Sequence, residues 1–468
     1  LEGGVKFDFT EMTISKDCFS QCNETNEDSE LNEADEAYDS DTEESKHVLQ
    51  SCFKSMVDTL SKQAPETITQ VQLLVRELRR ITLLWDELWL GTLMQHYNEI
   101  IKRQCQMEVE VQRVNENSNL SKEEKIYLIA EKYRIIIKPI LFILEQLHAV
   151  TSAEPETPHE KQFQEKYSST IVEVLDKMRN PNSTSKPKEI WYPLKMLHNK
   201  FQQKVHKRTT YSLRMQDISP LLANMKDTVI VMPGLKSVRV TISSISNHVT
   251  ILPTKTKPKK LVFHGCDGQN YTYLFKGLED LHLDERIMQF LSITNTMMAQ
   301  LTDGSGHNLY RARNYSVIPL GPRSGLISWV DGTTPVFALY KRWQQREAAK
   351  LSAKLTVSTS SNTMRPSELY YNKLKPLLKE HGVKNLENRK EWPLSVLKQV
   401  LTELMKETPS DLLAKELWCH SINTGTWWQT VKNYSYSTAV MSVIGYIIGL
   451  GDRHLDNVLI DLSSGEVV

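Results

Sequence analysis

The densest group of polar residues that could do chemistry lies near the end of the chain, between Gly449 and Asn457. Apolar residues precede it, and a short β-type run, residues 458–460, follows it. This order predicts a helix that ends at glycine, then a polar loop, then a strand. Within the loop, Asp452 could receive the proton of a hydroxyl group. Asn457, five positions later, could ligate Mg²⁺ through a neutral amide oxygen without adding charge beside a phosphate.

An Asp and an Asn at this separation would by themselves be weak evidence, because an ordinary polar loop could use the Asp as a cap. The flanking residues make the pattern much more specific. Protein kinases space their catalytic Asp and their metal-binding Asn in this way. The run Gly451-Asp452-Arg453-His454, followed by Asn457, resembles the catalytic loop of the phosphatidylinositol-kinase-related protein kinases and their lipid-kinase relatives.

The resemblance to this family extends over residues 436–457 and implies a role for individual residues of the loop. Asp452 would be the catalytic acid or base, and His454 would assist at the transferring phosphate. Asn457 would hold Mg²⁺ or Mn²⁺, with ATP as the phosphate donor.

A second segment, residues 274–286, agrees with the resemblance. It places a lysine at the end of a predicted strand, followed by acidic residues that lead into a helix. A cation there can neutralise the α- and β-phosphates of a nucleotide, and a carboxylate can fix its position. The resemblance implies the nucleotide-binding role for Lys276, with Glu279 and Asp284 as the acidic residues around it.

The segment 252–260 contains neither a G-x-G-x-x-G motif nor a Walker A motif. The resembled family covers the phosphates with a loop of Ser, Thr and basic residues. This implies that Thr254, Lys255 and Thr256 lie over the phosphates. A solvated basic turn is the alternative interpretation.

The segment Gly325–Val330 resembles the hinge of the same family. An adenine ring needs an apolar slot with backbone hydrogen-bonding groups at its edge. Trp329 and Val330 meet that need, although either could also be a core residue.

The first part of the chain predicts a linker followed by a helical bundle. Residues 24–44 hold eleven Asp or Glu and no Lys or Arg, so we assign residues 1–64 to an acidic disordered linker. Apolar residues at spacings of three and four predict helices within 68–103, 122–148, 160–179 and 190–206. Ser121 and Glu124 form a predicted capping box, and Pro139 should kink or split the second helix. Residues 65–215 resemble the four-helix rapamycin-binding domain found in the family.

After Ser219 the pattern changes to short β-type runs, within 228–232, 238–245, 261–264, 270–275, 316–320 and 326–330. Asp267-Gly268 predicts a hairpin between the third and fourth of these, and a helix is expected at 284–301. Beyond 331 the pattern is mostly helical, with a loose Ser/Thr-rich insert at 352–363. We therefore predict an α+β fold: a helical bundle, a kinase small lobe with its hinge (216–330), and part of a large lobe (331–468) that ends after the catalytic loop.

Bulk properties restrict the partners only weakly. The 57 Lys and Arg balance 57 Asp and Glu, so charge gives no direct indication of nucleic acid or of an acidic membrane. The six cysteines show no metal-ligand spacing, as expected of reduced thiols. No segment approaches the roughly 20 apolar residues of a membrane helix, and Ala439–Leu450 is predicted to be a buried helix. We expect a cytoplasmic protein with some nuclear presence.

The resemblance implies an ATP-dependent serine/threonine protein kinase that acts on Ser or Thr followed by Gln. Residues 276–290, 340–347 and 465–468 are similar to the branch of the family that works in nonsense-mediated mRNA decay. That branch implies an RNA helicase of the decay pathway as the protein substrate and accessory regulatory subunits as partners. Two alternatives are a non-catalytic scaffold or partner-binding fragment, and a lipid kinase, which charge neutrality and the lack of membrane elements weigh mildly against.

The family also needs a second metal-binding Asp, soon after the strand pair that follows the catalytic loop. The sequence ends at Val468, before that position, and Asp461 ends the first strand of the pair rather than the second. We therefore expect that the 468-residue chain is catalytically incomplete.

Overall fold

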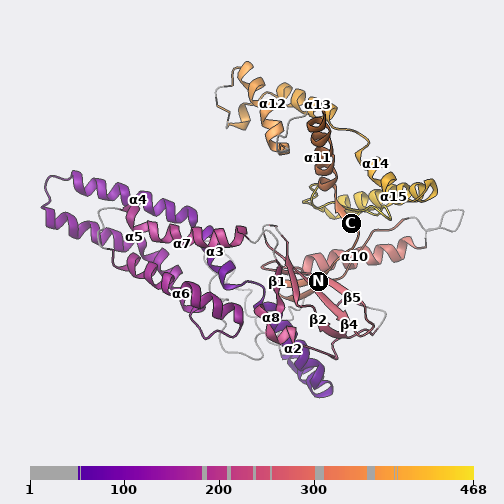
Figure 1. The fold of residues 1–468 in the computed structure, drawn as a ribbon, viewed down its shortest axis with the longest axis horizontal. Helices are drawn as coiled ribbons and strands as arrows, with labels where there is room; N and C mark the ends of the chain where they lie inside the picture. The colour runs from indigo at the N-terminus through magenta and orange to yellow at the C-terminus, as the bar shows by residue number, and fades with distance from the viewer. Residues whose placement is uncertain are drawn as a thin grey trace, which may run out of the picture. The chain divides into compact units, whose positions relative to one another are not determined.

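The computed structural model describes residues 51–52, 54–181, 187–207, 212–235, 239–252, 254, 256–300, 310–355, 364–383, 385–386 and 388–468. The chain divides into two compact units, one made of residues 1–285 and 316–329 and the other of residues 286–315 and 330–468. Helices and antiparallel sheets occur together (Figure 1), which confirms the α+β class. The acidic run 24–44 lies outside the described residues, and residues 54–63, inside the predicted linker, are helical.

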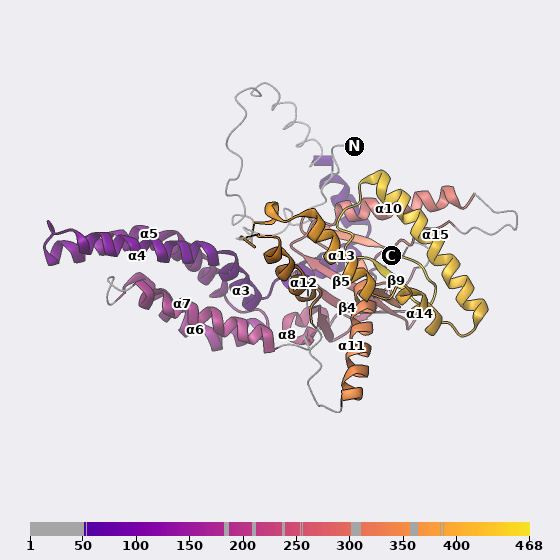
Figure 2. The same ribbon diagram turned by 90° about the horizontal axis from the view of Figure 1, so that it is seen from above.

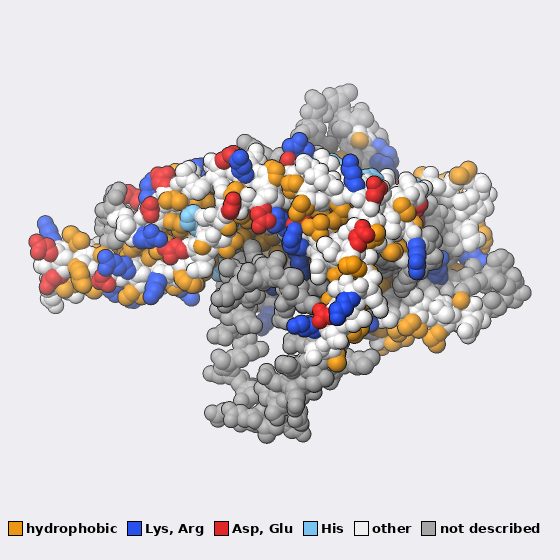
Figure 3. Space-filling view, turned by 90° about the horizontal axis from the view of Figure 1, so that it is seen from below, with side chains coloured by type: hydrophobic (Ala, Val, Ile, Leu, Met, Phe, Trp, Pro, Cys, Tyr) orange, Lys and Arg blue, Asp and Glu red, His pale blue; other side chains and the backbone are white. Residues whose placement is uncertain are grey.

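The first unit begins with a set of long helices. These are α2 (Pro65–Arg80), α3 (Trp85–Gln95), α4 (Tyr97–Glu116), α5 (Lys122–Thr151), α6 (Pro158–Arg179) and α7 (Pro187–Lys207). Helices α4 and α5 run side by side, as do α6 and α7 (Figure 2). Their core includes an aromatic group in which Phe201 contacts Trp89, Phe163 and Tyr167. Positively and negatively charged side chains are mixed over the visible surface of these helices (Figure 3). This agrees with the equal numbers of basic and acidic residues in the chain.

Two details of the helical prediction need correction. The periodic pattern 68–103 predicted one helix, but the chain breaks at Ile81–Leu84 and again at His96, giving α2, α3 and α4. The Glu87 carboxylate accepts the Leu84 N–H and so caps a new helix start. Helix α5 runs through Pro139 without a break, while its predicted Ser121–Glu124 capping box is confirmed.

The same unit contains a mainly meandering antiparallel sheet. Its strands are β1 (Ser212–Arg214), β2 (Ile242–Ile245), β3 (His248–Ile251), β4 (Lys259–Gly265), β5 (Asn270–Gly277), β6 (Val317–Gly321) and β7 (Ser324–Ser328), in the order β1-β3-β4-β5-β7-β6 with β2 also paired to β4. The predicted hairpin between β4 and β5 is confirmed, with Gly268 at φ 76° in its turn. Residues 228–232 form no strand. They lie beside residues 240–242 through an isolated bridge between Val231 and Thr241 and through backbone hydrogen bonds of Thr228, Ile230 and Met232.

A buried ion pair joins the helical part of this unit to the sheet. The Nζ of Lys259, at the start of β4, donates to the Glu87 carboxylate and to the Thr82 carbonyl, at 3.1 Å each. Lys259 is only 2% exposed. A buried ammonium group requires partners of this kind. The ion pair therefore fixes the position of the turn between α2 and α3 against the sheet.

The second unit is mainly helical. It contains most of α10 (His282–Met298), then β8 (Thr333–Pro335), α11 (Val336–Leu355), α12 (Pro366–Glu380), the 3₁₀ turn η2 (Arg389–Glu391), α13 (Leu394–Glu407), α14 (Leu412–Cys419), α15 (Thr424–Ile448) and β9 (Leu459–Asp461). The β8 and β9 strands form a small antiparallel pair. Helix α15 packs on α10 through Val440 and Ile444.

The prediction that Ala439–Leu450 is buried is wrong for part of its length. Val443, Tyr446 and Ile447 are exposed, because in the described residues only the side of α15 that carries Val440 and Ile444 is covered. None of the helices that the structure describes has the length and apolarity of a membrane span.

Candidate functional site

The polar loop of the second unit begins where α15 ends. Gly449 adopts φ 65°, and the Leu450 N–H donates to the Gly445 carbonyl at 2.8 Å, which closes the helix. Asp452 then adopts φ 57°, a left-handed conformation that is uncommon outside glycine. Backbone strain of this kind concentrates at functional sites, where the surrounding structure holds it. The backbone at Asp452 is therefore held in an uncommon conformation by the loop around it.

Asp452 and Asn457, which the sequence paired, lie in contact. The Asn457 side-chain Nδ2 donates to the Asp452 carboxylate Oδ2 at 2.9 Å and to the Asp452 backbone carbonyl at 3.1 Å. With its NH₂ group used in this way, the Asn457 amide presents its oxygen, Oδ1, to other partners. The Asp452 side chain is 77% exposed. An exposed carboxylate beside an oriented amide oxygen is a suitable arrangement for a proton acceptor next to a metal ligand.

His454 lies on the other side of the Asp452 carboxylate. Its Nδ1 accepts the Asp456 backbone N–H at 3.2 Å, and its Nε2 lies 3.8 Å from Asp452 Oδ1. Because Nδ1 acts as an acceptor, the neutral ring carries its proton on Nε2. The loop therefore presents an N–H donor and a carboxylate next to each other.

Asp461, at the end of β9, belongs to a different network. Arg313 Nη1 contacts the Asp461 carboxylate at 3.3 Å and the Glu466 carboxylate at 2.5 Å. Burial acts to raise the pKa of Asp461, but hydrogen bonds from Ser463 and Ser464 together bring that pKa below its ordinary value. Asp461 is therefore held by one arginine and by two serine neighbours in the described structure. The Arg313 contacts were not foreseen, because Arg313 lies 148 positions before Asp461 in the sequence.

The phosphate-binding candidates of the first unit are partly brought together. Lys276, near the end of β5, donates to the Glu279 carboxylate at 3.0 Å, and both side chains are about one-third exposed or less. Asp284 lies exposed in the first turn of α10. The structure therefore joins Lys276 to Glu279, the nearer of its two predicted acidic neighbours.

The predicted phosphate loop is the turn between β3 and β4. Thr254 and Thr256 are exposed there, and Lys255 lies outside the described residues. The Thr254 carbonyl accepts the Lys257 N–H at 3.2 Å, and Lys257 has φ 47°. The two threonine hydroxyl groups are thus accessible on a tight turn.

The two hinge candidates are fixed through their backbones. The Trp329 N–H donates to the Thr272 carbonyl at 2.9 Å, and the Val330 carbonyl accepts the Thr333 hydroxyl at 3.0 Å. The Lys260 ammonium lies 4.1 Å from the centre of a Trp329 ring, a cation–π contact that the sequence did not predict. Both residues are half-buried.

The donor set near Asn457 restricts how a divalent cation could be held. Among the described residues there is no group of three or more His, Cys, Asp or Glu side chains that could hold a metal ion. Magnesium is commonly bound by one or two protein oxygens together with substrate phosphates and water. The oriented Asn457 amide oxygen fits that shared mode of binding and does not fit a closed protein cage.

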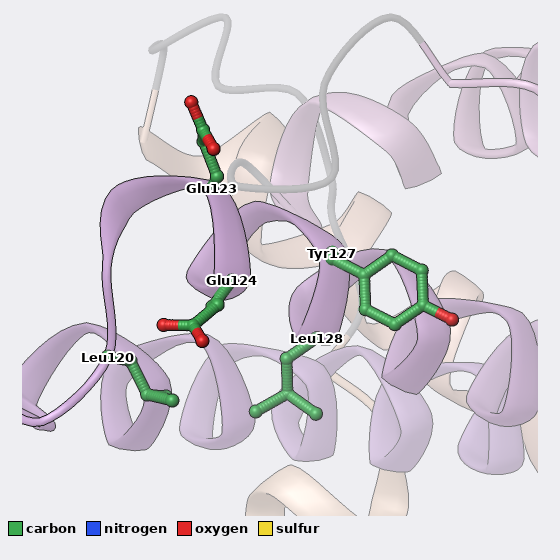
Figure 4. Close-up of a pocket in the computed structure, with 5 residues that line it drawn as sticks. All are labelled: Leu120, Glu123, Glu124, Tyr127 and Leu128. Carbon is green, nitrogen blue, oxygen red and sulfur yellow. The ribbon is translucent and has the colours of Figure 1, made fainter.

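The first unit has hollows in two places. One, of about 440 Å³, is at the turn between α4 and α5 and is lined by Leu120, Glu123, Glu124, Tyr127 and Leu128 (Figure 4). The other, of about 730 Å³, lies between the first turns of α6 and the segment Ser212–Ile218. Neither contains any of the predicted site residues.

Comparison with known proteins supports the family resemblance. The family described as Phosphatidylinositol 3- and 4-kinase matches residues 270–468, a range that holds both Lys276 and the 449–457 loop. The chain is 52% identical over 432 residues to the serine/threonine-protein kinase SMG1 of Danio rerio, covering 91% of this chain and 12% of that protein. It is 46% identical over 422 residues to Smg1 of Drosophila melanogaster, covering 89% and 13%.

The chain belongs to the phosphatidylinositol-kinase-related protein kinases. Within the family it is similar to proteins named SMG1. A third such protein, smg-1 of Caenorhabditis briggsae, is 38% identical over 433 residues, covering 90% of this chain and 18% of that protein. The chain spans less than one-fifth of the length of each of these relatives.

Proposed function

We propose that this chain forms part of an ATP-dependent serine/threonine protein kinase that uses Mg²⁺ or Mn²⁺. The observation that carries the proposal is the contact between Asp452 and Asn457, with His454 beside them. Phosphoryl transfer needs little covalent chemistry from the protein and depends on positioning and on charge stabilisation. A strained loop that holds a carboxylate, an amide oxygen and an imidazole N–H close together supplies such positioning.

Each predicted residue takes one part in this proposal. Asp452 accepts or orients the proton of the substrate hydroxyl, Asn457 ligates the cation, and His454 stands by the transferring phosphate. Lys276, positioned by Glu279, neutralises phosphate charge. The remaining proposed nucleotide-binding residues are Thr254, Lys255 and Thr256 over the phosphates, Trp329 and Val330 at the adenine, and Asp284.

The proposed substrate is a protein with Ser or Thr followed by Gln, namely the RNA helicase of nonsense-mediated mRNA decay. Support comes from the similarity to proteins named SMG1. We also propose that the kinase works with accessory regulatory subunits, in the cytoplasm and partly in the nucleus. These proposals concern the whole protein.

We further propose that catalysis needs a second acidic metal ligand beyond the described residues. Asn457 supplies one neutral oxygen, and Asp461 is held by Arg313 and by its serine neighbours. A divalent cation between two phosphates usually needs a carboxylate as well. Robust ATP-dependent phosphorylation by the purified 468-residue chain would contradict this.

The experiment that tests the main proposal is transfer of labelled phosphate from ATP to a Ser-Gln peptide by the full-length protein. Asp452→Asn should lower the rate by about 10²- to 10⁴-fold, the usual contribution of a positioned acid or base. Asp456→Asn, an exposed neighbour in the same loop, should retain activity. Unchanged transfer in Asp452→Asn would favour the scaffold alternative instead.

A further inference from the structure

Helices α12 and α13 form a hairpin with a core of its own. Leu374 and Leu378 of α12 pack against Val396 and Val400 of α13, and all four are almost fully buried. The two helices lie side by side (Figure 1). The partly buried residues that complete this core also come from α12, α13 and the segment between them.

The outer face of α13 carries a row of apolar side chains that nothing in the described residues covers. Leu394 is 79% exposed, Leu401 57% and Met405 68%. Their spacing of seven and four residues places them on one stripe of the helix, opposite the stripe that bears Val396 and Val400. Isolated exposed apolar residues are normal on a protein surface, but three in one row on a single helix indicate an interaction site.

The charges on α13 are divided between its two sides. Glu403 and Glu407 turn toward α12, where Lys373 pairs with them at 3.7 and 2.7 Å. Lys398 lies within the apolar row, and Lys406 lies on the flank of the helix between that row and Glu403. Both lysines are exposed and have no ion-pair partner in the described structure. The outer face is therefore apolar and positive, while the two glutamates of the helix turn toward Lys373 of α12.

We propose that the outer face of α13, formed by Leu394, Lys398, Leu401, Met405 and Lys406, docks an amphipathic helix of a partner protein with acidic residues along its apolar stripe. Apolar anchors at helical spacing are the usual means by which two helices recognise each other. Acidic residues flanking the partner's stripe would complement Lys398 and Lys406 and would set its orientation.

An anionic lipid surface is a second class of partner that matches an apolar and positive face. It is the less favoured partner, because attachment to such a surface generally needs a cluster of about four to eight basic residues. The outer face of α13 has two lysines. The proposal is independent of the proposed kinase activity, since none of the residues involved belongs to the 449–457 loop.

The test measures binding of designed helical peptides to the 468-residue chain by fluorescence anisotropy. One peptide carries leucines at helical spacing flanked by Glu, and a matched peptide carries Lys in place of Glu. The Glu peptide should bind and the Lys peptide should bind more weakly, with a difference that shrinks at high salt. Each of Leu401→Ser and Met405→Ser should weaken binding by about tenfold or more, as expected for loss of one buried apolar side chain.

Two further variants make the result decisive. The double variant Lys398→Glu/Lys406→Glu should reverse the preference in favour of the Lys peptide, and Glu403→Gln, on the side facing α12, should leave the preference unchanged. Circular dichroism checks that the variants remain folded. The proposal is overturned by no saturable binding of the Glu peptide below about 1 mM, by equal binding of both peptides, or by binding that Leu401→Ser does not affect. Stripe-dependent binding to phosphatidylserine vesicles, without peptide binding, would assign the face to membranes and would also overturn it.

Discussion

The Asn457 amide donates both to the carboxylate and to the backbone carbonyl of Asp452, at 2.9 and 3.1 Å. This pair of contacts fixes the amide in one orientation. It also holds the Asp452 backbone in its left-handed conformation. One side chain thus orders both the proposed proton acceptor and the proposed metal ligand.

We predict that Asn457→Ala in the full-length protein lowers phosphate transfer by about 10²-fold or more, since the amide acts on both groups. The Mg²⁺ concentration needed for half-maximal rate should rise as well. The measurement is the initial rate on a Ser-Gln peptide as a function of Mg²⁺. Asp456→Asn serves as the control within the loop. A lower rate with an unchanged Mg²⁺ requirement would assign Asn457 a positioning role without metal binding.

A second prediction concerns the buried pair of Lys259 and Glu87, which are 172 positions apart. Lys259→Met should destabilise the chain by about 3 to 5 kcal/mol, because it leaves a buried carboxylate without its counter-charge. Adding Glu87→Gln to Lys259→Met should cost less than the sum of the two single changes. Urea unfolding measures these free energies, and Lys226→Met, at an exposed position, is the control. Additive effects would show that the two charges do not depend on each other.

A third prediction concerns acid stability. The pKa of Asp461 is held below its ordinary value, so its ionised form stabilises the folded chain above about pH 4. That stability is lost as the pH falls through the folded-state pKa. Between pH 7 and pH 3 the wild-type chain should therefore lose more stability than Asp461→Asn does. Ser463→Ala, which removes one of the hydrogen bonds, should lie between them. Equal acid sensitivity in all three chains would refute the assignment.

A fourth prediction uses two glycines that share a left-handed backbone but differ in their surroundings. A Cβ atom on Gly465 would lie 2.1 Å from the Thr430 carbonyl oxygen, whereas one on Gly268 would meet nothing within 4 Å. Gly268→Ala should cost about 1 to 2 kcal/mol, from the backbone conformation alone. Gly465→Ala should cost about 1 to 3 kcal/mol more, because the close contact adds strain. Thermal unfolding compares the two, and equal losses would mean that the region around Thr430 relaxes freely.

Much of the site could be predicted from the order of residues, because its signals are local. The glycines that end α15, the polar loop and the strand β9 follow one another within a short stretch, and neighbouring residues determine such turns. The β4–β5 hairpin and the capped start of α5 were predictable for the same reason. The contact of Asp452 with Asn457 also spans only five positions.

Contacts between distant segments could not be read from the sequence. Nothing near Asp461 indicates that Arg313, 148 positions earlier, supplies its counter-charge. The division of one periodic stretch into α2, α3 and α4 likewise depends on the Thr82 carbonyl and Glu87 meeting Lys259 of the sheet. The exposure of Tyr446 depends on which helices pack against α15. Periodicity and spacing determine local conformation and residue type, whereas burial and charge pairing arise only when separate segments pack together.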